Sequence, residues 1–360
     1  MKKIIVLILL LFPVTICALE TSATSAILMD TDTNTILYEK NIHSVRSVAS
    51  ISKIMTAVIA IESNKLDETV TIGDEIKKAY GSGIYIKEGE ELTLRDLLYG
   101  LMLRSGNDAA LAIAKFIGGD IETFVDLMNN KAKELKMTNT TFNNPSGLDE
   151  EKGNYSTAYD MALLASYAIK LDEYKKITGT KKYTLTTNKN TYVWTNKNKL
   201  LSLYKYTTGG KTGYTEIAKR TLVTTATKDN TNLVVVTLND GNDWQDHQNL
   251  FEYGFNNYTT IKLISKGNIS IYNENYYDEY NLYVKNDFYY LIANDEEDSL
   301  LFKYELEKKR KTKNGDIVGN IVIYYGDSKI HEEPVYISKE KVKENKSFLD
   351  KIKDFISKLW

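Results

Sequence analysis

The sequence predicts an α+β protein in which helices pack on one antiparallel sheet, followed by a small all-β domain and a tail helix. Three observations support this class. Apolar runs separated by turn residues come first, apolar residues at helical spacing fill the middle, and segments rich in Thr, Val and Tyr return later. Strands on both sides of a helical block favour a single antiparallel sheet with helices against it. The length of 360 residues predicts roughly two domains.

The first part of the chain is expected to form a strand pair and then helices. Residues 24–39 hold two apolar runs separated by the turn-forming sequence Asp-Thr-Asp-Thr-Asn at 30–34. Apolar side chains then recur every three or four residues, which predicts helices at 51–62, 93–103, 107–117, 120–135 and 157–170.

Strand-like sequence returns after residue 180. Segments with strand composition lie at 182–194, 220–227 and 232–239. The last two flank a four-residue polar turn and predict a hairpin. A helix near 243–254 is expected to end at Gly254. Beyond it, alternating segments separated by Asn, Asp and Gly predict an all-β domain over 262–340, after a main domain over 19–261.

The composition excludes several classes of function. Lys and Arg number 46 against 48 Asp and Glu, so no basic excess points to nucleic acid, and we expect no nucleic-acid partner. One cysteine allows neither a disulfide framework nor a Cys-based zinc site. The three histidines, His43, His247 and His331, are far apart and lack the spacing of zinc ligands. We expect no metal and no cofactor.

The N-terminus has the pattern of a secretory signal peptide over residues 1–18. Two lysines follow the first Met, an apolar run spans 4–16, and Ala18 is a small exit residue. The run is shorter than the roughly 20 residues of a spanning helix and contains Pro13. A buried N-terminal helix is the alternative. Export, with the lone Cys17 removed, fits a bacterial extracytoplasmic protein.

The C-terminal segment 341–360 predicts an amphipathic helix. Its apolar residues recur at three- and four-residue steps: Phe348, Leu349, Ile352, Phe355, Ile356 and Leu359. Six lysines against three acidic residues give this segment a local charge of +3. Such a helix suits a membrane interface, here the outer face of the cytoplasmic membrane. The alternative is a terminal helix packed on its own domain.

A serine activated by a lysine is the chemistry that the composition leaves open. Histidine is scarce and no Gly-x-Ser-x-Gly sequence occurs. Ser-x-x-Lys begins at Ser50, Ser202 and Ser338, but the first copy alone opens an apolar helix. Ser50 and Lys53 would then share one helix face, and the positive helix N-terminus would help keep Lys53 neutral, as a base must be. The alternative is a serine cap beside a solvated lysine.

Two further motifs each occur once. Ser-Gly-Asn at 105–107 lies between two predicted helices, where a loop can present a hydroxyl and an amide to a cleft. Lys-Thr-Gly at 211–213 precedes the predicted hairpin, and a cation with a hydroxyl on an edge strand can bind a substrate carboxylate. Its glycine allows close backbone approach. Each motif alone is common, but all three in this order and in these structural contexts form a highly specific combination.

The three motifs in this order resemble those of the penicillin-binding and serine β-lactamase superfamily. Longer stretches are similar to low-molecular-mass D-alanyl-D-alanine carboxypeptidases: 49–56, 87–110, 144–148 and 155–162. The resemblance covers about residues 22–258. It implies the penicillin-binding, β-lactamase-like transpeptidase fold and removal of the terminal D-Ala from peptidoglycan stem peptides that end in D-Ala-D-Ala. It also implies inhibition by β-lactam antibiotics.

The resemblance further implies a role for each catalytic motif residue. Ser50 would be the nucleophile that forms the acyl-enzyme, and Lys53 would accept its proton. Ser105 would relay a proton toward the leaving amine, while Asn107 would position Lys53 and the substrate amide.

Substrate binding would fall to the third motif. Lys211 and Thr212 would hold the terminal carboxylate, next to Gly213. The backbone N–H groups of Ser50 and Tyr214 would form the oxyanion hole.

The chain departs from the family pattern at three places. Ser146 and Tyr214 stand where relatives have His, and the stretch 241–247 lacks the Arg that many relatives carry there. Arg220 is a candidate replacement for that Arg.

The sequence leaves three alternative functions open. A β-lactamase is one, although no Glu-x-x-Leu-Asn segment occurs and Gly106 stands where such enzymes often have Asp. A D,D-endopeptidase or transpeptidase on the same scaffold is another. A catalytically weak, membrane-bound wall-binding protein is the non-enzyme alternative.

Overall fold

The computed structural model describes residues 19–149, 152–271, 276–277, 280–294 and 296–338. The expected signal peptide at 1–18 and tail helix at 341–360 lie outside these residues. The chain divides into two compact units between Asn256 and Asn257. We describe each unit separately.

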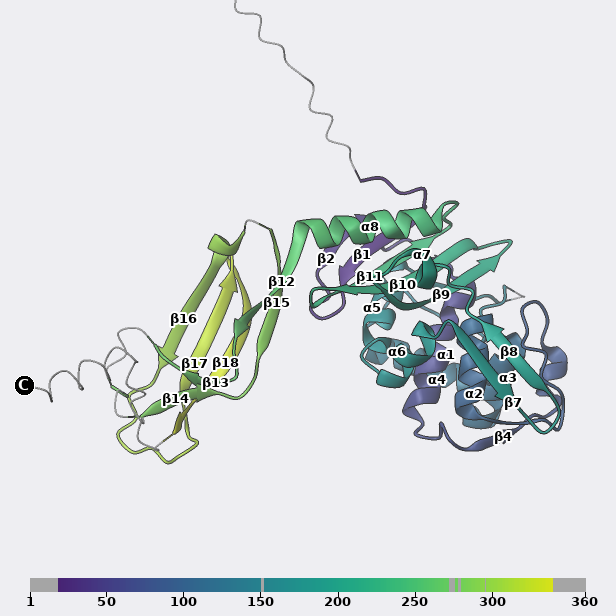
Figure 1. The fold of residues 1–360 in the computed structure, drawn as a ribbon, viewed down its shortest axis with the longest axis horizontal. Coiled ribbons are helices and arrows are strands. Elements are labelled where there is room, and N and C mark those ends of the chain that lie inside the picture. Colours follow the sequence, from purple (N-terminus) through teal and green to yellow (C-terminus); the bar gives the residue numbers. More distant parts are fainter. Residues whose placement is uncertain (1–18, 150–151, 272–275, 278–279, 295, 339–360) are drawn as a thin grey trace, which may run out of the picture. The chain divides into compact units, whose positions relative to one another are not determined.

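The first unit is built on a five-stranded antiparallel sheet with the order β2-β1-β11-β10-β9 (Figure 1). Its strands are β1 (Ser25–Asp30), β2 (Ile36–Lys40), β9 (Thr207–Thr215), β10 (Lys219–Lys228) and β11 (Thr231–Leu238). The early strand pair therefore joins the late hairpin in one sheet, as the sequence predicts. The strand that carries Lys-Thr-Gly, β9, is at the edge of this sheet.

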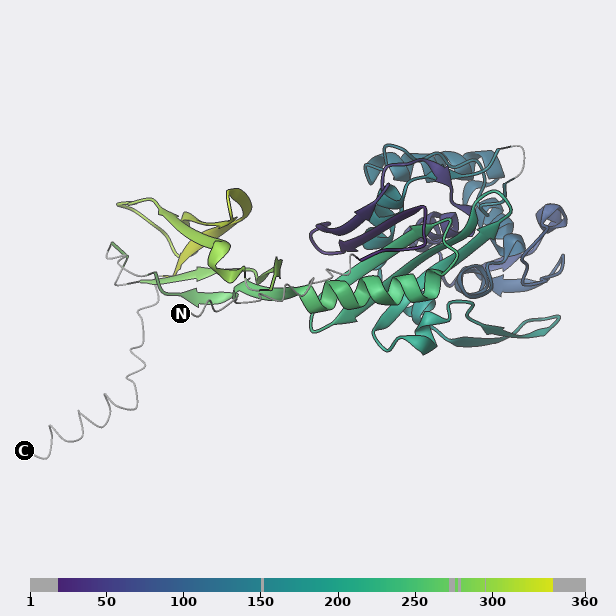
Figure 2. The same cartoon turned by 90° about the horizontal axis from the view of Figure 1, so that it is seen from above.

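Helices cover both faces of this sheet. α8 lies along one face, and the group containing α1 to α6 lies on the other side (Figures 1 and 2). Their bounds are η1 (Ala49–Ser52), α1 (Lys53–Glu62), η2 (Asp74–Lys78), α2 (Leu94–Arg104), α3 (Asn107–Gly118), α4 (Ile121–Glu134), α5 (Ala158–Ala168), α6 (Asp172–Gly179), α7 (Leu200–Leu203) and α8 (Asp243–Asn257). Thr93, Asp120 and Thr157 accept backbone N–H bonds at the N-termini of α2, α4 and α5, which fixes where these helices begin.

The prediction of a single strand-like segment at 182–194 is wrong, because these residues form two strands. β7 (Lys182–Thr186) and β8 (Thr191–Thr195) pair with each other in a separate two-stranded sheet. The hydroxyl of Thr187 accepts bonds from the backbone N–H groups of Lys189 and Asn190 and so closes the turn. The other two-stranded sheets of this unit pair β3 (Arg46–Ser47) with β6 (Tyr155–Ser156) and β4 (Thr69–Thr71) with β5 (Glu91–Thr93).

The expected end of the last helix at Gly254 is also wrong, since α8 continues to Asn257. Gly254 is buried inside the helix against the sheet. A Cβ there would lie 2.6 Å from Cδ1 of Leu233 and 3.1 Å from Cδ2 of Leu28. This glycine therefore allows close packing of helix on sheet and does not terminate the helix.

The second unit is all-β in its described residues, apart from one 3₁₀ turn, η3 (Glu297–Ser299). β12 (Tyr258–Ile264) pairs with β15 (Phe288–Ala293), which places residues 258–261 in this unit, ahead of the expected boundary at 261/262. A five-stranded antiparallel sheet follows, with the order β13-β14-β18-β17-β16. Its strands are β13 (Gly267–Ile269), β14 (Asn281–Val284), β16 (Leu300–Leu306), β17 (Ile317–Tyr325) and β18 (Ser328–Ser338).

Candidate active site

Ser50 lies in the short 3₁₀ turn η1, directly before α1. The preceding residue, Ala49, has a positive φ of 49°, which an L-residue adopts only at a cost in energy. Thr221 of β10 donates its hydroxyl proton to the carbonyl of Val48 at 3.0 Å and holds this segment against the sheet. Lys53 follows one turn after Ser50, on the same side, as the spacing predicts.

The Nζ atom of Lys53 meets three oxygen atoms. It lies 2.9 Å from Oγ of Ser50 and 2.7 Å from Oδ1 of Asn107, and it also contacts the main-chain carbonyl of Ser146. The amide and main-chain carbonyl oxygens can only accept protons. A neutral amine donates its two protons to them, and its lone pair is then left for the hydroxyl proton of Ser50.

The surroundings of Lys53 favour the neutral amine. The side chain is fully buried, and burial with the nearby charge of Lys197 lowers its pKa to about 7, against an opposing effect of Asp108. An amine with a pKa near neutrality is suited to general base catalysis.

The loop that supplies the carbonyl of Ser146 is a site element that the sequence analysis gave no role. The side-chain oxygen of Asn144 accepts bonds from the backbone N–H groups of Ser146 and Gly147. Gly147 has a φ of +78°, and a Cβ there would lie 2.0 Å from the carbonyl of Ala49. The Asn-Pro-x-Gly turn sequence was the available signal. Because the contact with Lys53 uses the main chain, Ser146 in place of His retains it.

Ser105 and Lys211 form a second serine–lysine pair in the same cleft. Nζ of Lys211 donates to Oγ of Ser105 at 2.9 Å and to the carbonyl of Thr212 at 2.6 Å. Lys211 is 1% exposed, and burial together with the charges of Lys53 and Lys197 lowers its pKa well below the ordinary value. Ser105 is the C-cap of α2 and has the left-handed conformation, with a φ of 64°.

Asn107 connects Lys53 to a loop before β5. Its Nδ2 donates to the carbonyl of Tyr80 at 2.6 Å, and its backbone N–H donates to the carbonyl of Ser82 at 2.8 Å. The next residue, Asp108, accepts the backbone N–H of Ile84 at 3.0 Å. These bonds fix the loop as one wall of the site.

The cleft itself is a cavity of about 310 Å³. Its lining residues are Ser50, Ser82, Ser105, Lys197, Thr212, Gly213, Tyr214, Arg220, Asp243 and Trp244. Five of the eight residues predicted from the motifs line it, and Lys53, Asn107 and Lys211 lie behind them in hydrogen-bond contact.

Gly213 brings the edge strand β9 close to Ser50. A Cβ there would lie 3.0 Å from the backbone N of Ser50 and 2.4 Å from Oγ1 of Thr221. The structure therefore confirms the predicted close approach at this glycine.

The comparisons with known proteins agree with this geometry. The family model described as D-alanyl-D-alanine carboxypeptidase matches residues 13–242, and the model of the penicillin-binding protein 5 C-terminal domain matches residues 258–344. The chain belongs to the D-alanyl-D-alanine carboxypeptidase family. The fold expected from the resemblance is thereby confirmed.

Three relatives show how much of this chain is similar to other proteins. The chain is 38% identical to D-alanyl-D-alanine carboxypeptidase DacF of Bacillus subtilis, over 68% of this chain and 65% of DacF. It is 31% identical to DacC of Escherichia coli, over 95% of this chain and 89% of DacC. The crystal structure of penicillin-binding protein 5 from Haemophilus influenzae has a TM-score of 0.72 at 27% identity and covers 89% of this chain and 97% of that one.

The structure also places the departures from the family pattern. Arg220 of β10, the candidate replacement for the missing Arg, lines the cleft beside Tyr214, its partner on β9. Four further cleft residues carried no motif: Ser82, Lys197, Asp243 and Trp244. Lys197 donates to Oγ of Ser82 at 3.1 Å, across 115 positions of sequence, so sequence spacing alone gives no sign of the contact.

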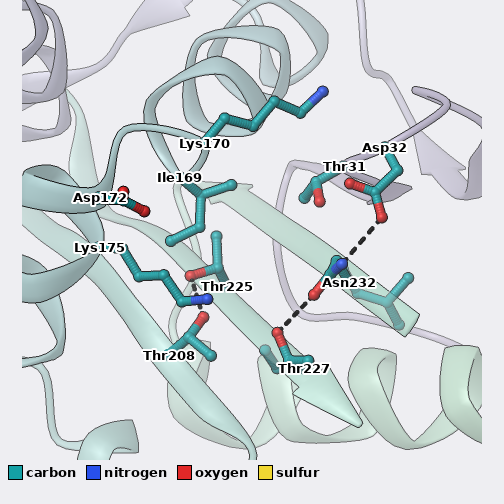
Figure 3. A pocket seen from close by; sticks show the side chains of 12 residues that line it. Thr31, Asp32, Ile169, Lys170, Asp172, Lys175, Thr208, Thr225, Thr227 and Asn232 are labelled. Carbon is teal, nitrogen blue, oxygen red and sulfur yellow. Dashed lines mark hydrogen bonds between the residues drawn. The ribbon is translucent and has the colours of Figure 1, made fainter. Parts of the chain in front are cut away.

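A second cavity of the carboxypeptidase unit also measures about 310 Å³ and is lined mainly by polar residues (Figure 3). Among its lining side chains, Asn232 donates to Asp32 at 2.9 Å and accepts from Thr227 at 2.8 Å, while the hydroxyls of Thr208 and Thr225 are 2.7 Å apart. Its two lysines, Lys170 and Lys175, are exposed. None of the motif residues lines it.

The described residues contain no group of three or more His, Cys, Asp or Glu side chains that could hold a metal ion. Within the same part of the chain, no helix has the length and apolar character needed to cross a membrane.

Proposed function

We propose that this member of the family is a serine D-alanyl-D-alanine carboxypeptidase that removes the terminal D-Ala from peptidoglycan stem pentapeptides. The observation that carries the proposal is the 2.9 Å contact of Oγ of Ser50 with Nζ of the buried Lys53, in a cleft walled by the other two motifs. β-Lactams would acylate the same serine.

Acylation would begin with transfer of the Ser50 hydroxyl proton to Nζ of Lys53 as Oγ attacks the scissile carbonyl. The backbone N–H groups of Ser50 and Tyr214 would stabilise the oxyanion, a contribution typically worth about 2.7–4 kcal/mol per donor. The hydroxyl of Ser105, bonded to Lys211, would pass a proton to the departing amine of D-Ala, and the proton taken up by Lys53 would then restore the Ser105 hydroxyl. Asn107 would keep Lys53 and the substrate amide in place.

Deacylation would return the enzyme to its starting state. Water attacks the ester carbonyl, a base of the cleft accepts the water proton, and Oγ of Ser50 leaves and regains a proton. Lys211 and Thr212, the latter in the lining of the cleft, would hold the terminal carboxylate of the substrate.

The test combines labelling with product analysis. We expect a fluorescent penicillin to label the wild-type protein and not Ser50→Ala, and mass analysis to show the loss of one alanine from a peptide ending in D-Ala-D-Ala. Labelling of Ser50→Ala would reject this nucleophile. Fast penicillin hydrolysis would instead favour a β-lactamase, and altered cross-links in muropeptides would favour an endopeptidase or transpeptidase. A folded protein that does neither chemistry would favour the wall-binding alternative.

The place of action is a second part of the proposal. The basic and apolar pattern of 341–360 and the signal-like segment 1–18 support an exported protein held on the outer face of the cytoplasmic membrane. Deleting 341–360 is expected to release the mature protein from membranes with its activity on soluble peptide unchanged. Continued membrane attachment of the deleted form would reject the anchor.

A further inference from the structure

The cavity of Figure 3 lies at the end of the sheet opposite the catalytic cleft. The strand β9 gives Thr208, near its first residue, to this cavity and Gly213, near its last residue, to the cleft. The strand β10 runs the other way and gives Thr227 to this cavity and Arg220 to the cleft. The two cavities have no described lining residue in common, so a ligand here would bind apart from the catalytic serine.

Thr31, directly after β1, lines the cavity with a hydroxyl that has nothing to bond to. The residue is 2% exposed, and among the described residues its hydroxyl has no hydrogen-bond partner (Figure 3). By contrast, the neighbouring side chains of Thr227, Asn232 and Asp32 are bonded in a chain. A buried hydroxyl without a partner costs free energy, which a hydrogen bond to a ligand in the cavity would recover.

A β-bulge brings further hydroxyl groups to the same cavity. Thr225 of β10 pairs with Gly209 and Ala226 pairs with Thr207, which leaves Thr208 as the extra residue of β9. The hydroxyl of Thr208 lies 2.7 Å from that of Thr225, which is 4% exposed. One hydroxyl of such a pair donates to the other, so one proton remains for a ligand. Bulges commonly re-aim a side chain next to a functional site.

The charged side chains in the lining balance one another. Lys170 and Lys175 carry two positive charges, Asp32 and Asp172 carry two negative charges, and all four residues are exposed. In the part of the chain that the structure describes, the ammonium groups of both lysines form no ion pair or hydrogen bond. A ligand with a net charge would meet a like charge in this lining, which therefore favours an uncharged ligand with many polar groups.

An amino sugar has this chemistry. Sugar hydroxyls both donate and accept hydrogen bonds, as the threonine and asparagine side chains of the cavity do. The apolar part of the lining can contact the methyl of an acetamido group and consists of Ile169, Ala226 and Leu233. The volume of about 310 Å³ is at the lower end of the range for small-molecule sites, about 300–1,000 Å³.

We infer that the cavity of Figure 3 binds an uncharged N-acetylated sugar, a unit of the glycan that carries the stem peptides. That the sugar belongs to the wall glycan rests on the proposed carboxypeptidase function, whereas the chemistry of the cavity does not. Binding of the polymer at this second site would hold the enzyme on it while the cleft acts on stem peptides.

The experiment titrates N,N′-diacetylchitobiose, a disaccharide of N-acetylglucosamine, into the mature protein and follows its amide signals by NMR. Maltose, D-alanine and inorganic phosphate are titrated in the same way. The variants are Thr31→Val and Lys175→Met, with the matched controls Thr21→Val and Lys176→Met. Thr21 is also a buried threonine whose hydroxyl lacks a partner in the described residues, and Lys176 is exposed, but neither control lines the cavity.

The disaccharide is expected to bind the wild-type protein saturably and to shift amide signals around the cavity. Thr31→Val and Lys175→Met should each weaken binding by about 3- to 10-fold, the effect of losing one hydrogen bond, while both controls match wild type. Maltose should bind more weakly because it lacks the acetamido group, and D-alanine and phosphate should not bind. Penicillin acylation should be unchanged in all four variants.

Four results overturn the inference: no saturable binding of the disaccharide, equal affinity in wild type and both cavity variants, equal binding of maltose, or binding of D-alanine or phosphate in place of the sugar. Because Lys175 is exposed, its variant keeps the test decisive if Thr31→Val does not fold. Failure of the proposed function is a separate result, because there the wild-type protein releases no D-Ala from a free peptide, whether or not it binds the sugar.

Discussion

The two cavities of the first unit have the same volume, about 310 Å³, yet differ in their chemistry. Both contain hydroxyl groups and lysines. In the cavity of Figure 3 the lysines are exposed to water, and most of its threonine and asparagine side chains are bonded to one another. In the catalytic cleft two lysines are buried directly behind two serine hydroxyls. The two cavities therefore differ in the desolvation of lysines next to hydroxyls and not in volume, and desolvation favours the neutral amine that a base requires.

The hydroxyl groups of the two cavities give the largest expected contrast. Ser50→Ala is expected to reduce acylation by penicillin by at least about 10³-fold, because Ser50 supplies the oxygen that forms the ester in the proposed mechanism. Thr225→Ala removes a buried hydroxyl of the other cavity and should leave acylation within twofold of wild type. Equal loss in both variants would show that the effect is general destabilisation, which a thermal melt of each protein checks.

The lysines of the two cavities give the next contrast. Lys53→Met removes the proposed base and is expected to lower the acylation rate by about 10²- to 10⁴-fold. Lys175→Met is the matched change at an exposed lysine of the other cavity and should have no measurable effect. The rate of penicillin acylation under single-turnover conditions measures both. A fully active Lys53→Met would refute the role of the desolvated Lys53 as the base.

Two glycines, Gly213 and Gly241, test how closely the backbone must approach the cleft. In Gly213→Ala the new Cβ meets the amide of Ser50 and the hydroxyl of Thr221, so β9 must shift. A displacement of about 1 Å in such a site can cost about 10²-fold in rate. Gly241→Ala has no atom within 4 Å of its new Cβ and should keep wild-type kcat/KM. If Gly213→Ala also kept it, the close approach of β9 would be irrelevant to catalysis.

His247 separates desolvation from catalysis, since it is buried but lines neither of the two cavities. Its ring nitrogens meet the hydroxyls of Thr224 and Thr237, and burial lowers its pKa to about 3. Below pH 6.5 the unfolded state binds a proton that the folded state excludes. The free energy of unfolding therefore decreases as the pH is lowered. Between pH 6.5 and 5 the wild type should lose about 1.6 kcal/mol relative to His247→Gln. Urea unfolding measures this difference, and identical pH slopes for the two proteins would contradict it.

The fold and the catalytic motifs were predictable where the information is local. Ser50 and Lys53 are one turn apart, so their sequence spacing already places them together. Threonine and aspartate at helix starts, and polar turns between strands, likewise mark boundaries within a few residues. The order of the three motifs then pointed to the family, which the matching family models confirm.

The remaining parts depend on contacts that sequence spacing does not report. The carbonyl of Ser146 reaches Lys53 across 93 positions, and it is a main-chain group with no side-chain signature. Arg220 and Asp243 are 23 positions apart and meet only because α8 begins beside β10. Gly254 looked like a helix end, because local sequence cannot distinguish a terminating glycine from one that permits close packing.

The pH dependence of acylation tests whether neutral Lys53 is the base. If neutral Lys53 is the base, the second-order rate of penicillin acylation rises with pH as Lys53 loses its proton. The account predicts a tenfold increase per pH unit below about pH 7 and a plateau above it, since the pKa of Lys53 is about 7. A rate that keeps rising to pH 9 and beyond, as an ordinary lysine requires, would contradict the account.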